Sequence, residues 1–186
     1  MKKIIILSFV WMIAFQAYSY DQEQLDQFRN TNFCIHCNLI EAFLNEENHN
    51  HALLTESDLS EARIKNAQFN EAEITACQFV RANVDGSSFR KAKLDGTNFS
   101  FFSGRYAAFN SASFKNANLT HTRLYAANFA KADFTDADLE DADLNNTILI
   151  GSNLTQEQLA KVKNLNCAVL PEGRVYNPGK RKCREF

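Results

Sequence analysis

The residues best suited to chemistry in this sequence lie near its N-terminus. The segment CIHC, residues 34–37, places two thiols three positions apart with a histidine between them. Dithiol oxidoreductases use this spacing, and a neighbouring histidine lowers the pKa of a thiol. His49 and His51 follow in the sequence, so two cysteines and two histidines, all ligand types that zinc takes, lie close together along the chain. Residues 34–37 therefore allow a redox site, a zinc site or a structural disulfide.

The rest of the sequence offers little for catalysis. No Ser/His/Asp arrangement, paired-carboxylate cleft or phosphate-binding loop can be assembled from it. The 20 basic residues are outnumbered by 22 acidic ones, and no basic stripe of the kind that binds nucleic acid is present in the sequence. We therefore expect no enzyme activity, no cofactor and no nucleic-acid partner.

The first 19 residues have the pattern of a signal peptide. Two lysines precede an apolar run from Ile4 to Phe15, and Ala17 and Ser19 are small residues spaced for signal-peptidase cleavage. The run is shorter than the roughly 20 residues that a membrane-spanning helix needs. We expect the mature chain to begin at Tyr20 and to be exported, either to a periplasm or into the medium, without a membrane span. An uncleaved N-terminal anchor is the alternative.

The elements that would position these residues follow from an internal repeat. Every fifth residue from Leu54 to Leu154 is large and apolar except Gly104, and the residue two positions before each is small except Phe102. A period of five fits neither a helix nor a strand, so each unit must contain its own corner. Four corners would close a coil of twenty residues that stacks on the next at about 4.8 Å.

The repeat resembles the pentapeptide-repeat family, whose units have the pattern A(N/D)LXX. The segment ANFAKADFTDADLEDADL, residues 127–144, fits this motif without a gap. The resemblance implies an all-β solenoid, a right-handed quadrilateral parallel β-helix of about five coils with short helical caps at both ends. The cysteine-containing tail after the repeats is similar to that of exported members of the family.

Residues twenty positions apart should stack in columns. One column contains Phe69, Phe89, Phe109 and Phe129, which we interpret as a core ladder and not as a ligand site, because buried aromatic rings dominate core energetics. The charged residues related in this way are all of opposite sign. These pairs are Glu61 and Arg81, Lys65 and Asp85, Asp85 and Arg105, Glu71 and Lys91, Glu73 and Lys93, Asp95 and Lys115, and Arg123 and Asp143.

Both ends of such a stack need caps, because they expose backbone edges and apolar interior. Residues 21–30 are predicted to form a short helix with its apolar side chains inward, and residues 45–51 (NEENHNH) to leave the repeat as a loop. At the other end Thr155 and Gln158 form a capping box that predicts a helix over residues 156–163.

Five cysteines in an exported chain indicate two disulfides and one free thiol. Cys77 occupies a small inward position and is interpreted as a buried thiol. Five coils would hold the two ends about 20 to 25 Å apart, whereas a disulfide needs Cα atoms within about 7 Å. Pairing is therefore expected to be local, joining Cys34 to Cys37 and Cys167 to Cys183. The expected divisions are a signal peptide (1–19), an N-terminal cap with the first irregular repeats (20–51), the β-helix (52–154) and a C-terminal capping helix with a disulfide-closed tail (155–186).

Two outward-facing groups are candidate docking sites. Because Gly104 leaves an inward position empty, we expect the ring of Phe102 to fill it and to distort this coil. Phe101, Arg105 and Tyr106 would face outward beside the irregular point, and aromatic residues with arginine are typical of interface centres. The second group is an acidic patch. Its members are Asp133, Asp136, Asp138, Glu140, Asp141 and Asp143.

These observations favour a non-catalytic exported scaffold whose solvent-facing walls bind another protein. Some cytosolic pentapeptide-repeat proteins resemble duplex DNA in shape and charge and bind type II topoisomerases, so a DNA-mimic function is one alternative. A thiol-redox or zinc site at residues 34–37 is the other. The sequence leaves open whether the protein forms a homodimer through one of its caps.

Overall fold

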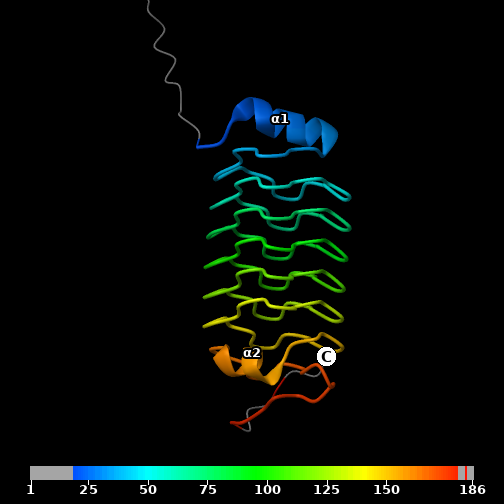
Figure 1. Cartoon of the computed structure of the whole chain (residues 1–186), viewed down its shortest axis with the longest axis vertical. Helices are drawn as coiled ribbons and strands as arrows, with labels where there is room; N and C mark the ends of the chain where they lie inside the picture. Colours follow the sequence, from blue (N-terminus) through cyan, green and yellow to red (C-terminus); the bar gives the residue numbers. More distant parts are fainter. Residues whose placement is uncertain (1–18, 180–182, 184–186) are drawn as a thin grey trace, which may run out of the picture.

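The computed structural model describes residues 19–179 and residue 183 (Figure 1). Helices α1 (Gln22–Thr31) and α2 (Gln156–Lys161) cover the two ends of a stack of flat coils. The expected signal peptide lies outside the described residues, apart from Ser19. Over the part of the chain that the structure describes, no helix is long and apolar enough to cross a membrane.

The coils are joined by parallel backbone pairing at a separation of twenty residues. Single residues pair at every fifth position, from Phe33 with Leu53 to Asn128 with Ile148, and residues 33–154 contain no continuous strand. The regular stack therefore begins near residue 33, not at residue 52, and has about six coils instead of the expected five. The twenty-residue period itself is as the sequence predicts.

Each coil has four corners, and every corner residue adopts the left-handed conformation. From His36 to Gly151 each fifth residue has a positive φ, and only three of these residues are glycine. Residues other than Gly, Asn and Asp rarely adopt this conformation. Hydrogen bonds to the next coil hold it in place; the Glu61 N–H, for example, donates to the Val80 carbonyl at 2.8 Å. The stacking of coils thus enforces turns that an isolated repeat would not keep.

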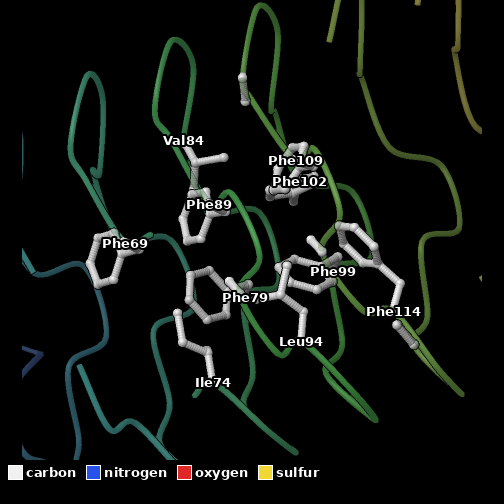
Figure 2. Packing of buried hydrophobic residues seen from close by; sticks show 14 of the residues in the cluster. Phe69, Ile74, Phe79, Val84, Phe89, Leu94, Phe99, Phe102, Phe109 and Phe114 are labelled. Atoms are coloured by element: carbon white, nitrogen blue, oxygen red, sulfur yellow. The ribbon is translucent and has the colours of Figure 1, made fainter. Parts of the chain in front are cut away.

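The interior is filled by the large and small inward residues of the repeat. Figure 2 shows the predicted ladder, in which Phe69 and Phe89 stack with ring centroids 5.1 Å apart and Phe89 and Phe109 at 5.4 Å. Phe129 continues the column at 5.0 Å from Phe109, and all four side chains are buried. The Phe-rich composition is therefore explained by the core.

Polar residues at small inward positions are satisfied by backbone groups. The Thr97 hydroxyl donates to the Ile74 carbonyl at 2.8 Å, and the Ser87 hydroxyl donates in the same way to the Ile64 carbonyl. Buried polar groups need such partners to avoid a desolvation cost. Ser and Thr can therefore replace Ala inside the coil without leaving an unpaired hydroxyl at these two positions.

The predicted loop at residues 45–51 is wrong, because these residues continue the coil. Asn48 pairs with Gln68 at the regular separation, and His49 points inward with 2% of its surface exposed. The His49 ring stacks on Phe28 of α1 at 4.3 Å and lies 5.2 Å from Phe69, so it joins the helical cap to the Phe column. A buried histidine takes the place of a large apolar residue here.

Both nitrogens of His49 are paired. Nδ1 lies 2.6 Å from Oδ1 of Asn32, and Nε2 lies 3.0 Å from a carboxylate oxygen of Glu47. Glu47 also pairs with Arg29 of α1 at 2.9 Å. Burial lowers the pKa of His49, although the hydrogen bond with Glu47 opposes the shift. Protonation of the His49 ring is therefore less favourable in the folded cap than in solution.

The C-terminal cap has the predicted capping box. The Thr155 hydroxyl accepts a hydrogen bond from the Gln158 N–H, and the Gln158 side chain accepts one from the Thr155 N–H. Helix α2 ends at Lys161, two residues before the expected end, because Val162 is extended. Leu159 is buried against the last coil.

After α2 the chain returns to the stack with one extra residue. Asp143 pairs with Asn164 and Ile148 with Val169, a separation of 21 instead of 20. The Gln158 side-chain amide donates to two carbonyls of the preceding coil, one of them that of Phe134 at 2.8 Å. The helix thus satisfies part of the coil edge that it covers.

The Gly104 position is compensated as predicted, but without a distortion. A Cβ on Gly104 would lie 2.8 Å from the Phe102 ring, which is fully buried and occupies this space. Ser103 keeps its parallel pairing with both Asn83 and Arg123, so the coil is regular. The expected distortion of this coil is therefore wrong, and Gly104 does not have a positive φ.

Four of the seven predicted charge pairs are ion pairs. They are Arg81 with Glu61 (3.8 Å), Lys91 with Glu71 (2.8 Å), Lys93 with Glu73 (3.4 Å) and Arg105 with Asp85 (2.7 Å). The pairs that do not approach within 4.0 Å are Lys65 with Asp85, Asp95 with Lys115, and Arg123 with Asp143. Asp85 stands between two cations of its column and pairs with Arg105, and Lys115 pairs instead with Asp133 at 3.4 Å.

Candidate binding surfaces

The N-terminal cysteines form a disulfide inside the first coil. Cys34 and Cys37 are bonded, with Cα atoms 5.7 Å apart, and both are buried. His36 between them is at an exposed corner, where Nδ1 lies 3.4 Å from Glu56. The disulfide links a large and a small inward position across one corner, so it belongs to the core.

The histidines expected to complete a zinc site lie elsewhere. His49 is buried in the core, where its ring stacks on Phe28. His51 is an exposed corner residue whose Nδ1 lies 3.7 Å from a carboxylate oxygen of Glu71. No group of three or more His, Cys, Asp or Glu side chains that could hold a metal occurs among the residues that the structure describes. The geometry therefore gives no support to the zinc interpretation.

The other cysteines have the expected arrangement. Cys167 and Cys183 form a disulfide with Cα atoms 5.4 Å apart, which ties the tail to the last coil. Cys77 is a free, fully buried thiol. Burial raises the pKa of Cys77 to about 12, so the thiolate, which is the reactive form, is not populated at neutral pH.

The acidic residues are spread around the coil and do not form one patch. Asp138 and Glu140 lie on one side, which we call the acid wall; it comprises residues 58–60, 78–80, 98–100, 118–120 and 138–140. Asp136 and Asp141 are the corners on either side of it, whereas Asp133 and Asp143 lie on the two adjoining sides. The acid wall has no Lys or Arg, and its acids lie near its two ends.

Two of these acids interact with side chains of other residues. Asp133 accepts hydrogen bonds from Thr135, Asn153 and Lys115, which lower its pKa to about 2. Asp141 lies 3.5 Å from Nδ1 of His121. An open cavity of about 490 Å³ separates the acid wall from α2; its lining includes Asp136, Asp138, Glu157 and Lys161.

The candidates Phe101, Arg105 and Tyr106 lie on a different side, which we call the arginine wall. It comprises residues 62–65, 82–85, 102–105 and 122–125 with the corners beside them. The wall turns two columns of side chains outward. One contains Arg63, Asn83, Ser103 and Arg123, and the other contains Lys65, Asp85, Arg105 and Tyr125.

Phe101 is held in a stack at one corner of the arginine wall. The Arg81 guanidinium lies 5.9 Å from the ring centroid, and the His121 ring stacks on Phe101 at 4.8 Å. Glu61 and Asp141 continue the same column through ion pairs. Cations and rings of the protein itself therefore cover both faces of Phe101, and its edge is the part left to solvent.

Arg105 is engaged in a similar way. Its side chain donates two hydrogen bonds to Asp85 at 3.0 and 2.7 Å, and Ser103 donates a third to the same carboxylate at 2.7 Å. Burial raises the pKa of Asp85, but the hydrogen bonds from Arg105 and Ser103 outweigh it and hold this pKa below its usual value. Arg105 is thus a fixed, partly neutralised group.

Tyr106 is the most accessible of the three. It is 62% exposed, and its ring meets Tyr125 edge to face with centroids 5.5 Å apart. On the opposite side of the Tyr106 ring, the corner residue of the preceding coil is Gly86, which has no side chain to cover the ring. An open depression of about 400 Å³ lies there, lined by Tyr106, Gly86, Arg90 and nearby polar residues.

The structure adds three basic residues that the sequence did not identify as candidates for a docking site. Arg63, Lys65 and Arg123 are exposed on the arginine wall, and within the described residues none of them has an ion-pair partner within 4.0 Å. Arg63 lies over the exposed Phe43 ring at 4.8 Å. The twenty-residue spacing could have placed Arg63 and Arg123 in one column, but the sequence could not show which cations remain unpaired.

Comparison with known proteins agrees with this architecture. The family model "Pentapeptide repeats" matches residues 67–100 and 112–156 with eight copies. These residues are therefore pentapeptide repeats, as the sequence predicts. The gap in the match contains Phe102 and Gly104, where the large and small inward positions are exchanged.

Solved pentapeptide-repeat structures are similar at low sequence identity. Rfr23 from the cyanobacterium Cyanothece 51142 is 19% identical over 72% of this chain and 95% of its own, with a TM-score of 0.46. QnrB1, a plasmid-mediated fluoroquinolone resistance protein, is 19% identical over 71% and 79%, with a TM-score of 0.42. A pentapeptide-repeat protein from the Arabidopsis thaliana thylakoid lumen is 22% identical over 63% and 74%, with a TM-score of 0.32. Comparison with curated proteins gives no match.

Proposed function

We propose that this pentapeptide-repeat protein is an exported, non-catalytic scaffold that binds a protein partner through its arginine wall. The observation that carries the proposal is the gathering of exposed aromatic and basic side chains on one side of the solenoid. Tyr106 is open to solvent at one corner, Arg105 is paired next to it, and Phe101 is stacked at the opposite corner of the wall. Rigid aromatic residues with arginine are typical of the residues that dominate binding energy.

A scaffold role accounts for the interior as well. The inward residues fill the coils, and the solenoid has walls instead of the deep apolar cleft that a small substrate needs. The two cysteines with redox spacing are a buried disulfide in the first coil. A protein partner on a wall needs neither a cleft nor a reactive side chain.

Export is supported by the cysteine chemistry. Disulfides persist in oxidising compartments, and two of them here lie at opposite ends of the stack. The leader-like pattern of residues 1–19 points the same way. N-terminal sequencing of the protein from its own compartment should begin at Tyr20. A protein that keeps its first residues and stays in the cytoplasm would contradict export.

A DNA-mimic function is less well supported by the walls. Mimicry needs a broad, negatively charged surface. Between its two acidic ends the acid wall is neutral, with Gln78, Val80, Asn98 and Ser100 as outward residues. The adjoining arginine wall carries unpaired cations. The two walls together do not present a continuous negative face.

The binding proposal is tested by capture from the native compartment. Mature wild-type protein is compared with Tyr106→Ala and with Lys131→Glu, a control at an exposed corner outside the arginine wall. We expect one captured protein to be retained by wild type and by the control but lost with Tyr106→Ala. Equal capture by all three proteins would show that the arginine wall is not the binding surface.

A further inference from the structure

We infer that the partner presents an extended acidic segment to the arginine wall, an inference that rests on the proposed function. The unpaired cations of the wall define the chemistry of the occupant. Arg63, Lys65 and Arg123 are exposed, whereas Arg81 and Arg105 are paired with acids of their own columns. After these internal pairs are set aside, the wall keeps three unpaired cations, Arg63 and Lys65 in one coil and Arg123 three coils away.

This positive wall is distinctive because the protein as a whole is acidic. Without the two leader lysines, 18 basic residues face 22 acidic ones. The acid wall next to it holds acids and no Lys or Arg. A negatively charged segment would therefore be attracted to one wall and repelled by its neighbour, which fixes the side on which it docks.

Arg123 has one acidic neighbour in its column, Asp143. The two side chains do not approach within 4.0 Å, and an oxygen of Asp143 accepts the Asn145 N–H. The Arg123 guanidinium is therefore available to a carboxylate of another chain. Arg63 is available in the same sense, since its described contact is with the Phe43 ring.

The positions of the cations give the spacing of the acids. Arg63 and Arg123 belong to one column and are separated by Asn83 and Ser103. Three coil spacings make about 14 Å, and an extended chain covers about 3.3 Å per residue, so carboxylates about four positions apart would reach both arginines.

Tyr106 provides an anchor between the two cationic ends. Its ring is covered by Tyr125 on one side and open over Gly86 on the other. The depression there opens from this corner onto the adjoining side of the coil and is bounded by Arg90, a further exposed cation. An aromatic or apolar residue midway between the two acids would contact the Tyr106 ring while both acids are engaged.

The test uses the mature, disulfide-bonded chain and fluorescein-labelled peptides in a Gly/Ser background. Each peptide carries one tyrosine flanked by two aspartates, and the separation of the aspartates is two, four or six positions. A peptide with two lysines at a separation of four is the control. Fluorescence anisotropy should show the tightest binding at a separation of four, and 0.5 M NaCl should weaken it because salt screens exposed charges.

Charge reversal on the protein identifies the wall. Arg63→Glu with Arg123→Glu should raise the Kd at least tenfold, and Lys65→Glu should raise it less. Lys131→Glu changes the charge by the same amount per site as each reversal but lies outside the wall, so it should leave the Kd unchanged. Circular dichroism of every variant should match wild type, because the changed residues are exposed.

Several results would overturn the inference. One is equal binding of the aspartate and lysine peptides, and another is the absence of any peptide binding at millimolar concentration. A single-stranded oligonucleotide that binds more tightly and is lost in the same variants would make the occupant a nucleic acid. If a captured partner depends on Tyr106 and yet no acidic peptide binds, this inference fails while the proposed function stands.

Discussion

The core ladder makes a quantitative prediction at Phe89. This ring is buried in the middle of the stack between Phe69 and Phe109, with centroid distances of 5.1 and 5.4 Å and interplanar angles of 6° and 18°. Phe89→Ala removes the ring from both neighbours at once. Because the coils above and below are closed by backbone pairing, they cannot collapse fully into the space, and a cavity remains.

The size of the loss can be assembled from its parts. Burial of a Phe side chain contributes about 1.5 to 3 kcal/mol. Each stacked aromatic pair adds roughly 0.5 to 1.5 kcal/mol beyond its buried area, and Phe89 makes two such pairs. Together these parts give about 2.5 to 6 kcal/mol. We expect Phe89→Ala to lower the free energy of unfolding by about 3 to 5 kcal/mol, the usual cost of this substitution in a core, which lies within that range.

Urea unfolding followed by circular dichroism measures this loss. The matched control is Phe101→Ala, a Phe on the outside of a neighbouring coil that is 49% exposed. The control should cost less than about 1 kcal/mol, as exposed substitutions usually do. A loss below about 1 kcal/mol for Phe89→Ala, or equal losses for both variants, would refute the assignment of the Phe column as the main source of stability.

Three further predictions concern the caps and the free thiol. Burial holds the folded-state pKa of His49 below the ordinary histidine value of about 6.5, so acidification through and below that value should destabilise the native cap. His49→Phe should flatten the dependence of the unfolding midpoint on pH between about 7 and 5, and an unchanged pH profile in the variant would contradict this. Cys77 should react with a thiol reagent only when the protein unfolds, and modification of one thiol per chain in the native state would show that it is not buried. Cys167→Ala with Cys183→Ala should cost about 3 kcal/mol in urea unfolding, because the disulfide closes a loop of about 15 residues in the unfolded chain; a loss below about 0.5 kcal/mol would count against this account.

The repeat made most of the fold predictable. A period of five with alternating large and small inward residues fixes the corners, the twenty-residue coil and the Phe column without knowledge of any contact. The capping box at Thr155 and Gln158 likewise depends on residues three positions apart. Such features follow from short-range pattern, because each unit repeats the same local geometry.

The continuation of the coil through residues 45–51 was missed because the inward residues there are polar. Glu47 and His49 look like loop residues, and their partners Arg29 and Asn32 come from the region of α1. A buried histidine is acceptable only once its partners are known, and these are supplied by the packing of the helix on the coil. Sequence periodicity contains no information about that packing.

The sequence predicted where the residues of the candidate surface lie, but not which of its charged side chains are paired. The outward placement of Phe101, Arg105 and Tyr106 followed from the repeat. The stacking of Arg81 and His121 on Phe101 was also available in principle, because both lie twenty residues from it. Asp85 lies between Lys65 and Arg105, and side-chain conformation decides which of the two cations it pairs with. The sequence therefore could not show which cations of the arginine wall are left without an ion-pair partner.

The division between interior and walls also explains how such a chain can be specific without a pocket. The inward residues and backbone pairing hold every outward column in a fixed register, so the distance between two outward side chains is set by their separation in sequence. Arg63 and Arg123 stand three coils apart with uncharged Asn83 and Ser103 between them. A flexible surface could adjust to acids at many different spacings, whereas the fixed arginines of this wall match a single spacing. That spacing could be changed by substitutions of exposed residues, whose effect on stability is usually within about 0.5 kcal/mol. If the arginine wall binds an acidic segment as proposed, recognition is encoded in the pattern of the outward columns and is nearly independent of the core that supports them.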